Sequence, residues 1–328
     1  MKNNVIISLI LLVTLILPLF TNVESVQASS FFRIRSINNH QSNYTASSKL
    51  VATPVLTTAS IVVAPPTSST LQWGAYVGDG STGVSDLESL VGTKMTIVAD
   101  FEAFDATFPT NLSAKVGQQG KTLEVFWEPS TGFDSIINGS LDNSIKQFAS
   151  GAKSYGYPVI LVPFDEMNLN EEAWGYSING NTAAKFVQAW QHVHDLFAGL
   201  SNVKFGLDFN NVSIPNIKGN QFSDYYPGSN YVDYVGVDGY NFGSPWQSVS
   251  QVFSSALAQV STFGKPIYIF ATASTPGTQK ASWITSFGTY VKSYPNLQGW
   301  VWFDVNKEAD WRVNSDNTSL SAFESIIK

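Results

Sequence analysis

The feature that most constrains the fold of this chain is an alternation of short apolar segments with longer amphipathic ones across residues 71–328. Short apolar runs of this kind are typical of buried strands. They lie near residues 71–77, 94–101, 122–128, 158–164, 203–209, 231–238, 266–271 and 299–303. Helical patterns between them are clearest at residues 182–200, 247–263 and 279–294. Eight strands that alternate with helices predict an α/β protein with a closed parallel sheet, the (β/α)8 or TIM barrel.

The length of this region favours the barrel over its main alternative. Residues 71–328 come close to the roughly 250 residues that are typical of a (β/α)8 barrel. An open, doubly wound sheet is the alternative, and its nucleotide-binding versions carry a glycine-rich phosphate loop after a strand. No such loop follows any of the expected strands. We therefore expect a single barrel domain over residues 71–328.

The first residues of the chain have the pattern of a secretory signal. Lys2 supplies a positive start, residues 5–20 are almost wholly apolar, and Val26-Gln27-Ala28 resembles a small-residue cleavage site. An uncleaved anchor helix is the alternative, although the apolar run is short for crossing a bilayer. We expect a cleaved signal peptide at residues 1–28, and hence a secreted or cell-surface protein.

The segment between the signal and the barrel has a different composition. Residues 29–70 are rich in Ser, Thr, Ala, Val and Pro, which predicts a linker or a disordered arm. The apolar residues 61–63 could instead form an edge strand, which would move the domain boundary.

The charge and residue content of the chain exclude several classes of function. The formal net charge is -7, from 25 acidic and 18 basic residues, and no basic run is present that would hold nucleic acid or an anionic membrane. The 9 Trp, 13 Tyr and 22 Phe suit a neutral ligand. Cysteine is absent, which excludes disulfides and thiolate metal sites. His192 and His194 would lie on different sides of a helix, which argues against a shared metal site. We expect no metal and no cofactor, and we expect a monomer.

Carboxylates and aromatic residues gather where the expected strands end, which is where a parallel barrel builds its active site. Glu166 follows the buried strand at residues 158–164 and is the candidate proton donor; the alternative is a glutamate that caps a helix or faces solvent. Sugars are bound by aromatic faces together with carboxylates and amides. The substrate-binding candidates are Trp127, Glu128, Asn168, Trp174, Asp238, Tyr240, Trp246, Trp302, Asp304 and Trp311. Trp190, Trp283 and Trp300 lie inside expected elements and are assigned to the core.

Several short motifs together resemble glycoside hydrolase family 26, which contains endo-β-mannanases and mixed-linkage β-glucanases. The resemblance covers most of residues 71–328. It is carried by Val125-Phe126-Trp127-Glu128-Pro129, Pro163-Phe164-Asp165-Glu166-Met167-Asn168, Tyr231 to Asn241 (YVDYVGVDGYN), Lys265-Pro266-Ile267 and Asp310-Trp311-Arg312. It implies a (β/α)8 barrel that acts on β-linked polysaccharide, with one catalytic glutamate after the fourth strand and another after the seventh. The first of these corresponds to Glu166, as acid/base.

The chain departs from the family pattern at the second catalytic position. The resemblance places the nucleophile at residue 271, where this chain has alanine, and no carboxylate occurs from Lys265 through Thr285. The family also commonly has Arg and His where this chain has Val162 and Asp165. A retaining glycosidase needs two carboxyl groups, one of which attacks the sugar. Alanine cannot do this.

Three interpretations follow from that departure. The protein could be a hydrolase in which Asp238 or Asp304 activates a water, since an inverting mechanism tolerates a wider carboxyl separation. It could instead bind polysaccharide without turnover. A structural role at the cell surface is the third interpretation, and it would depend on residues 29–70 and an uncleaved anchor.

Overall fold

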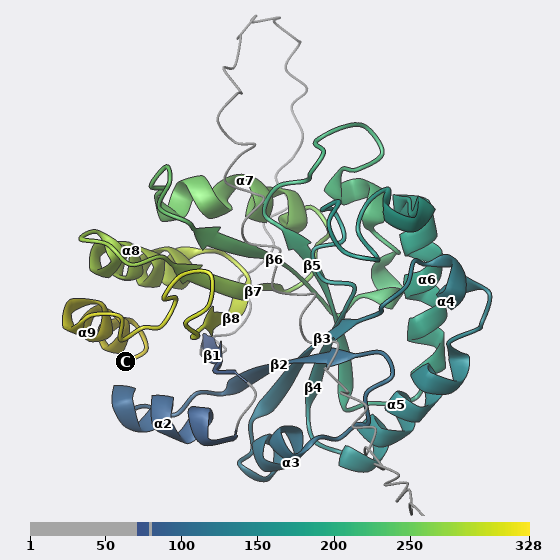
Figure 1. Ribbon diagram of the computed structural model, residues 1–328, viewed down its shortest axis with the longest axis horizontal. Helices are drawn as coiled ribbons and strands as arrows, with labels where there is room; N and C mark the ends of the chain where they lie inside the picture. The colour runs from purple at the N-terminus through teal and green to yellow at the C-terminus, as the bar shows by residue number, and fades with distance from the viewer. Residues whose placement is uncertain (1–70, 79–80) are drawn as a thin grey trace, which may run out of the picture.

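The computed structural model describes residues 71–78 and 81–328. The expected signal peptide at residues 1–28 and the expected arm at residues 29–70 lie outside the described residues. Within them, eight parallel strands form a closed barrel in which each strand pairs with its neighbours in chain order and the last pairs with the first. The fold class predicted from the sequence is therefore confirmed. In Figure 1 the strands occupy the centre and the helices surround them.

The bounds of the strands agree with the apolar runs in the sequence to within a few residues. The strands are β1 (Gln72–Tyr76), β2 (Ile97–Ala103), β3 (Thr122–Glu128), β4 (Val159–Pro163), β5 (Val203–Asn210), β6 (Tyr234–Asn241), β7 (Ile267–Ser274) and β8 (Leu297–Phe303). Most of their residues are buried, because one face of each strand points into the barrel and the other is covered by helices.

The outer layer consists of helices that follow the strands. They are α2 (Ser81–Val91), α3 (Asn111–Gln118), α4 (Asp134–Ile137), α5 (Asp142–Tyr155), α6 (Ala183–Leu196), α7 (Val249–Ser261), α8 (Lys280–Ser293) and α9 (Asn317–Ile326). Short 3-10 helices lie at Ile178–Gly180, Phe222–Tyr225 and Ser229–Tyr231. Trp190, Trp283 and Trp300 are buried, in agreement with their assignment to the core. Among residues 71–78 and 81–328, no helix is both long and apolar enough to cross a membrane.

One aromatic side chain fills the middle of the barrel and explains two glycines of the neighbouring strands. A Cβ atom at Gly206 would lie 2.7 Å from the Phe270 ring, and a Cβ at Gly236 would lie equally close at 2.7 Å. Because any larger side chain would collide with that ring, β5 and β6 carry glycine at these inward positions. The ring therefore separates the two ends of the barrel interior.

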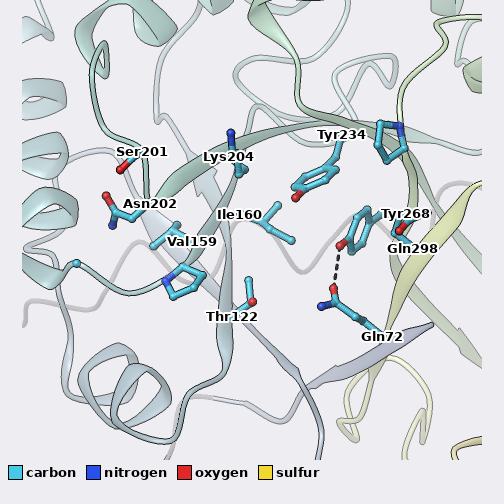
Figure 2. A pocket seen from close by; sticks show the side chains of 13 residues that line it. Gln72, Thr122, Val159, Ile160, Ser201, Asn202, Lys204, Tyr234, Tyr268 and Gln298 are labelled. Carbon is cyan, nitrogen blue, oxygen red and sulfur yellow. Dashed lines mark hydrogen bonds between the residues drawn. The ribbon is translucent and has the colours of Figure 1, made fainter. Parts of the chain in front are cut away.

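The end of the barrel where the strands begin contains a cavity of about 570 Å³. Its lining comes mainly from the first residues of the strands, including Gln72, Thr122, Lys204, Tyr234 and Tyr268. In Figure 2 the two tyrosine rings lie close together, and Tyr268 donates a hydrogen bond to Gln72 at 2.9 Å. Barrel enzymes keep their catalytic groups at the opposite end. We therefore look for the functional site at the carboxyl ends of the strands.

Candidate active site

Glu166 lies in a tight turn directly after β4. Its backbone has φ of +51°, and Phe164 two residues earlier has φ of +58°, so two non-glycine residues adopt the left-handed conformation here. This conformation costs free energy and persists only where the surroundings impose it. Phe164 is fully buried, with its ring 5.3 Å from that of Phe133, and this packing fixes the turn. The fold thus maintains an unfavourable backbone in order to hold the Glu166 carboxyl where it is.

A network of amides sets the position of the Glu166 side chain. Glu166 is 7% exposed, and its Oε1 accepts a hydrogen bond of 2.7 Å from Nδ2 of Asn210, the last residue of β5. Asn168 holds Asn210 in turn: its Oδ1 accepts from the Asn210 backbone N–H at 2.9 Å, and its Nδ2 donates to the Asn210 carbonyl at 3.0 Å. Asn168 is fully buried, so it orients the carboxyl and is not open to a ligand.

Ala271 and Asp238 lie side by side in the same row of the sheet. Asn210 pairs with Asp238 across β5 and β6, and Asp238 pairs with Ala271 across β6 and β7. Paired residues of parallel strands point to the same face. The row therefore runs from the amide that binds Glu166, through a carboxyl, to the alanine.

A β-bulge in β7 turns Ala271 toward the interior. Val237 pairs with Ile269, whereas the next residue, Asp238, pairs with Ala271, so Phe270 is the extra residue. The ring of Phe270 already points into the barrel, and strict alternation would send Ala271 outward. Bulges of this kind redirect side chains next to active sites. Here the bulge places residue 271 on the same face as Asp238.

The carboxyls around this row lie in a poorly solvated environment. Burial raises the pKa of Asp238 well above its ordinary value, and Asp208, Glu166 and, more weakly, other carboxyls raise it further. Asp238 Oδ1 has no hydrogen-bond partner within the described part of the chain. Burial also raises the pKa of Glu124, an inward-facing residue of β3, well above its ordinary value. Burial therefore favours the neutral form of Asp238, whose Oδ1 is buried and unpaired among the described residues.

Asp304, the other carboxylate considered as a water activator, is engaged elsewhere. It follows β8, and its Oδ1 accepts a hydrogen bond of 2.7 Å from the backbone N–H of Val313. Burial raises the pKa of Asp304 to about 6, although this hydrogen bond and the nearby Lys280 act in the opposite direction. Only Asp238 is paired in the sheet with Ala271, so the geometry favours Asp238 over Asp304 as a second carboxyl.

Three of the tryptophans that are predicted to offer their faces to a sugar are buried in the structure. Trp127 is fully buried with its ring 3.8 Å from Phe104 and 4.6 Å from Phe148 of α5, so it belongs to the layer between sheet and helices. Trp302 is fully buried against α8 and α9. Trp174 is 2% exposed and donates its indole N–H to the Asp165 carbonyl at 2.8 Å. Each has a structural role.

The remaining aromatic candidates form a small surface at the end of β6. Tyr240 and Trp246 are half-buried, as is Phe242 between them. Trp311 is 1% exposed and lies behind this surface, with its ring 5.6 Å from Tyr240 and 5.5 Å from Phe242. We call Tyr240, Phe242 and Trp246 the β6 aromatic surface. Glu128, at the end of β3, is half-buried and lies three strands away.

Sequence reasoning did not select Asn210 or Glu124 for the site. Asn210 could have been found, because a polar residue that ends an apolar strand of a barrel faces the mouth. Glu124 is a charged residue within an otherwise apolar strand, which is itself a signal because such residues are seldom buried without a role. Within the described ranges, no group of three or more His, Cys, Asp or Glu residues is arranged to hold a metal ion.

Comparisons with known proteins place the chain among glycoside hydrolases. The family described as glycosyl hydrolase family 26 matches residues 104–322. Endoglucanase H of Acetivibrio thermocellus is 36% identical over an alignment of 278 residues, and the match covers 79% of this chain but only 31% of that longer protein.

Solved structures share the fold at low sequence identity. The catalytic domain of an endo-β-1,4-mannanase from Bacillus sp. JAMB-750 is 15% identical with a TM-score of 0.60, covering 78% of this chain and 85% of that one. The β-mannanase BoMan26A from Bacteroides ovatus is 15% identical with a TM-score of 0.58, covering 79% and 88%.

Proposed function

Because this chain belongs to glycosyl hydrolase family 26, we propose that it binds a β-linked glucan at the carboxyl ends of its strands, with Glu166 as the proton donor. The observation that supports this most directly is the held geometry of Glu166: a left-handed backbone, a nearly buried carboxyl and a hydrogen bond from Asn210. A buried carboxyl is easier to keep protonated, which an acid catalyst requires.

The relative with the higher sequence identity supports glucan as the substrate class. Its name describes an endoglucanase, and it shares 36% of its aligned residues with this chain. The mannanase structures are only 15% identical, so they bear on the fold alone. We therefore rank mixed-linkage or β-1,4-linked glucan ahead of mannan, which stays an alternative.

Residue 271 decides whether binding leads to hydrolysis. We propose that Ala271 occupies the position of the family nucleophile, which leaves Glu166 without the second carboxyl at the usual ~5–5.5 Å of a retaining enzyme. Its pairing with Asp238 and its inward orientation at the bulge are consistent with that assignment. On this proposal the protein recognises β-glucan and turns it over slowly or not at all.

Hydrolysis by a different second carboxyl remains a candidate because of Asp238. It lies next to Ala271 in the sheet and close enough to Glu166 for that carboxyl to raise the pKa of Asp238. In that case Asp238 would take a proton from a water that attacks the sugar while Glu166 protonates the leaving oxygen. A general base must be ionised, and burial raises the pKa of Asp238, so we place this role second.

A substitution at residue 271 separates the two candidates. We expect Ala271→Glu to create β-glucanase activity that Glu166→Gln abolishes, because the pair of carboxyls would then be complete. Reducing-sugar release from barley β-glucan and from mannan is measured for the parent, Ala271→Glu, and the double variant. Activity in the parent that Asp238→Asn removes would instead favour the inverting scheme.

Binding is measured separately, so that an inactive protein is still informative. Calorimetric titration of the parent with β-glucan and manno-oligosaccharides should give heat with the glucan. If neither class of oligosaccharide binds at millimolar concentration, the proposed function is wrong. We also propose export from the cell, on the strength of residues 1–28; sequencing the mature N-terminus of the secreted protein tests it.

A further inference from the structure

Lys280 is a fully buried lysine that has no part in the site around Glu166. It is the first residue of α8 and has 0% exposed surface. Burial disfavours an ammonium, and so does the positive end of the helix dipole at the first turn. This position is unfavourable for a cation in two ways, so the contacts of the ammonium must offset both.

All three hydrogen bonds of the Lys280 ammonium go to a single loop. Its Nζ donates to the carbonyl of Asp310 at 3.0 Å, to the carbonyl of Arg312 at 2.7 Å and to Oγ of Ser315 at 2.9 Å. An ammonium has three N–H donors, and here all are used. The acceptors lie in residues 304–316, which connect β8 to α9 and which we call the β8–α9 loop.

Two further hydrogen bonds hold the same loop, one from β8 and one within the loop itself. Nε1 of Trp302 donates to the carbonyl of Trp311 at 2.9 Å. Oδ1 of Asp304 accepts from the backbone N–H of Val313 at 2.7 Å. Lys280 therefore ties the loop to α8, whereas Trp302 ties it to β8 and Asp304 braces it internally.

The β8–α9 loop supports the β6 aromatic surface. Trp311 is its buried aromatic residue, and its ring lies against Tyr240 and Phe242. Tyr240 is two residues beyond Asp238 on β6, so the surface begins beside the carboxyl row. A displacement of the loop would remove the support behind these rings.

We propose that Lys280 is a positioning residue, whose ammonium holds the β8–α9 loop so that Trp311 keeps Tyr240 and Phe242 in place to bind glycan. This inference rests on the proposed function, since it concerns the affinity of that site. It makes glycan binding depend on a contact outside the carboxyl row, and it gives binding a dependence on pH.

The charges around Lys280 set that dependence. Burial lowers the pKa of Lys280 to about 8; Asp310, Asp304 and Asp316 oppose this effect, and Arg312 adds to it. Burial raises the pKa of Asp304 to about 6. Both groups are therefore charged between about pH 6 and pH 8. As the pH rises through about 8, Lys280 loses its charge and one donor, so the loop loosens and glycan affinity falls.

The test compares affinity for a β-glucan tetrasaccharide, measured by calorimetry from pH 6 to pH 9.5, in the parent and in Lys280→Met. At pH 7 we expect the variant to bind roughly tenfold more weakly, because hydrogen bonds to a charged group are lost. At pH 9.5 the difference between the two proteins should be smaller, because the neutral amine of Lys280 has lost its charge and one of its three donors. Lys280→Arg, which stays charged, should keep its pH 7 affinity at pH 9.5.

A second buried lysine provides the matched control. Lys121 is 6% exposed and donates to Glu88 and to the Met95 carbonyl, at the other end of the barrel. Lys121→Met removes a buried ammonium without touching the loop, so it should lower thermal stability and leave glycan affinity and its pH profile unchanged.

The outcomes separate this inference from the proposed function. If the parent binds the tetrasaccharide and Lys280→Met binds equally well at every pH, the inference is wrong and the proposed function stands. If the parent binds no glycan, the proposed function is wrong, and amide hydrogen exchange in residues 304–316 decides whether Lys280 positions the loop. Exchange no faster in Lys280→Met than in Lys121→Met would overturn that role too.

Discussion

Two buried glutamates on opposite sides of the sheet differ in their hydrogen-bond partners. Glu88 of α2 is 4% exposed and accepts hydrogen bonds from Lys94, Lys121 and the Met95 backbone. Glu124, inside the barrel, is fully buried, and neither of its oxygens has a hydrogen-bond partner among residues 71–78 and 81–328. A buried carboxylate that is paired with lysines is compatible with a stable fold, whereas a buried carboxylate without partners lowers the free energy of unfolding.

The pKa directions of the two residues express the same difference. Burial pushes the pKa of Glu88 upward, but the hydrogen bonds of Lys121 and Lys94 outweigh it, so that the pKa is lowered. For Glu124, burial alone acts, and the pKa is raised well above its ordinary value. Uncompensated carboxyls are thus concentrated in the barrel interior beside Asp238, which is where a site that handles protons would tolerate them.

The largest expected loss of stability comes from breaking the compensated pair. Lys121→Met leaves Glu88 buried with only the exposed Lys94 as a cationic partner, and should lower the free energy of unfolding by about 3 kcal/mol at pH 7. The pKa of Glu88 is lowered in the folded protein. The stability that this carboxylate contributes is therefore present at pH values above its pKa in the unfolded chain, and it is lost as the pH falls through its pKa in the folded protein. Urea denaturation at pH 7 and pH 3.5 measures both. A loss of equal size at the two pH values would contradict this account.

The opposite sign is expected inside the barrel. The pKa of Glu124 is raised in the folded protein above the ordinary value of 4.5, so unfolding releases a proton and stability falls as the pH rises above that value. Glu124→Gln removes this dependence. The variant should gain stability relative to the parent by up to about 1.4 kcal/mol per pH unit above pH 4.5, until Glu124 itself ionises.

Thermal denaturation between pH 4 and pH 8 checks this prediction. The melting temperatures of Glu124→Gln and the parent should coincide near pH 4 and separate as the pH rises. A variant that is less stable than the parent at pH 7 would mean that the Glu124 carboxyl has a favourable partner.

The sequence predicts the barrel because its strands are apolar on both faces. For the same reason it does not indicate which face of each strand points toward the barrel axis. In β3, Glu124 and Phe126 point inward while Trp127 points toward the helices. Alternation separates the two sets without saying which of them faces the barrel axis. For this reason the sequence places Trp127 and Trp302 at the site, although their side chains pack on the outer face of the sheet against the helices.

The bulge at Phe270 was equally hidden. Nothing in the apolar run of β7 distinguishes a regular strand from one with an extra residue, since the bulge is set by pairing with β6. The position of Glu166, by contrast, could be predicted, because a carboxylate that directly follows a buried strand must emerge at the mouth of the barrel.

The smallest expected effect sharpens the comparison between the two ends of the barrel. Tyr268 lines the cavity where the strands begin, and its hydroxyl donates to Gln72 at 2.9 Å. Tyr268→Phe removes this single neutral hydrogen bond while the ring stays in place, so the free energy of unfolding should fall by about 1 kcal/mol. The Phe270 ring lies between this residue and the carboxyl row, 5.8 Å from the ring of Tyr268. Glycan affinity, measured by the same calorimetric titration, should therefore be unchanged, and a weaker affinity in Tyr268→Phe would show that the two ends are coupled through the packed interior.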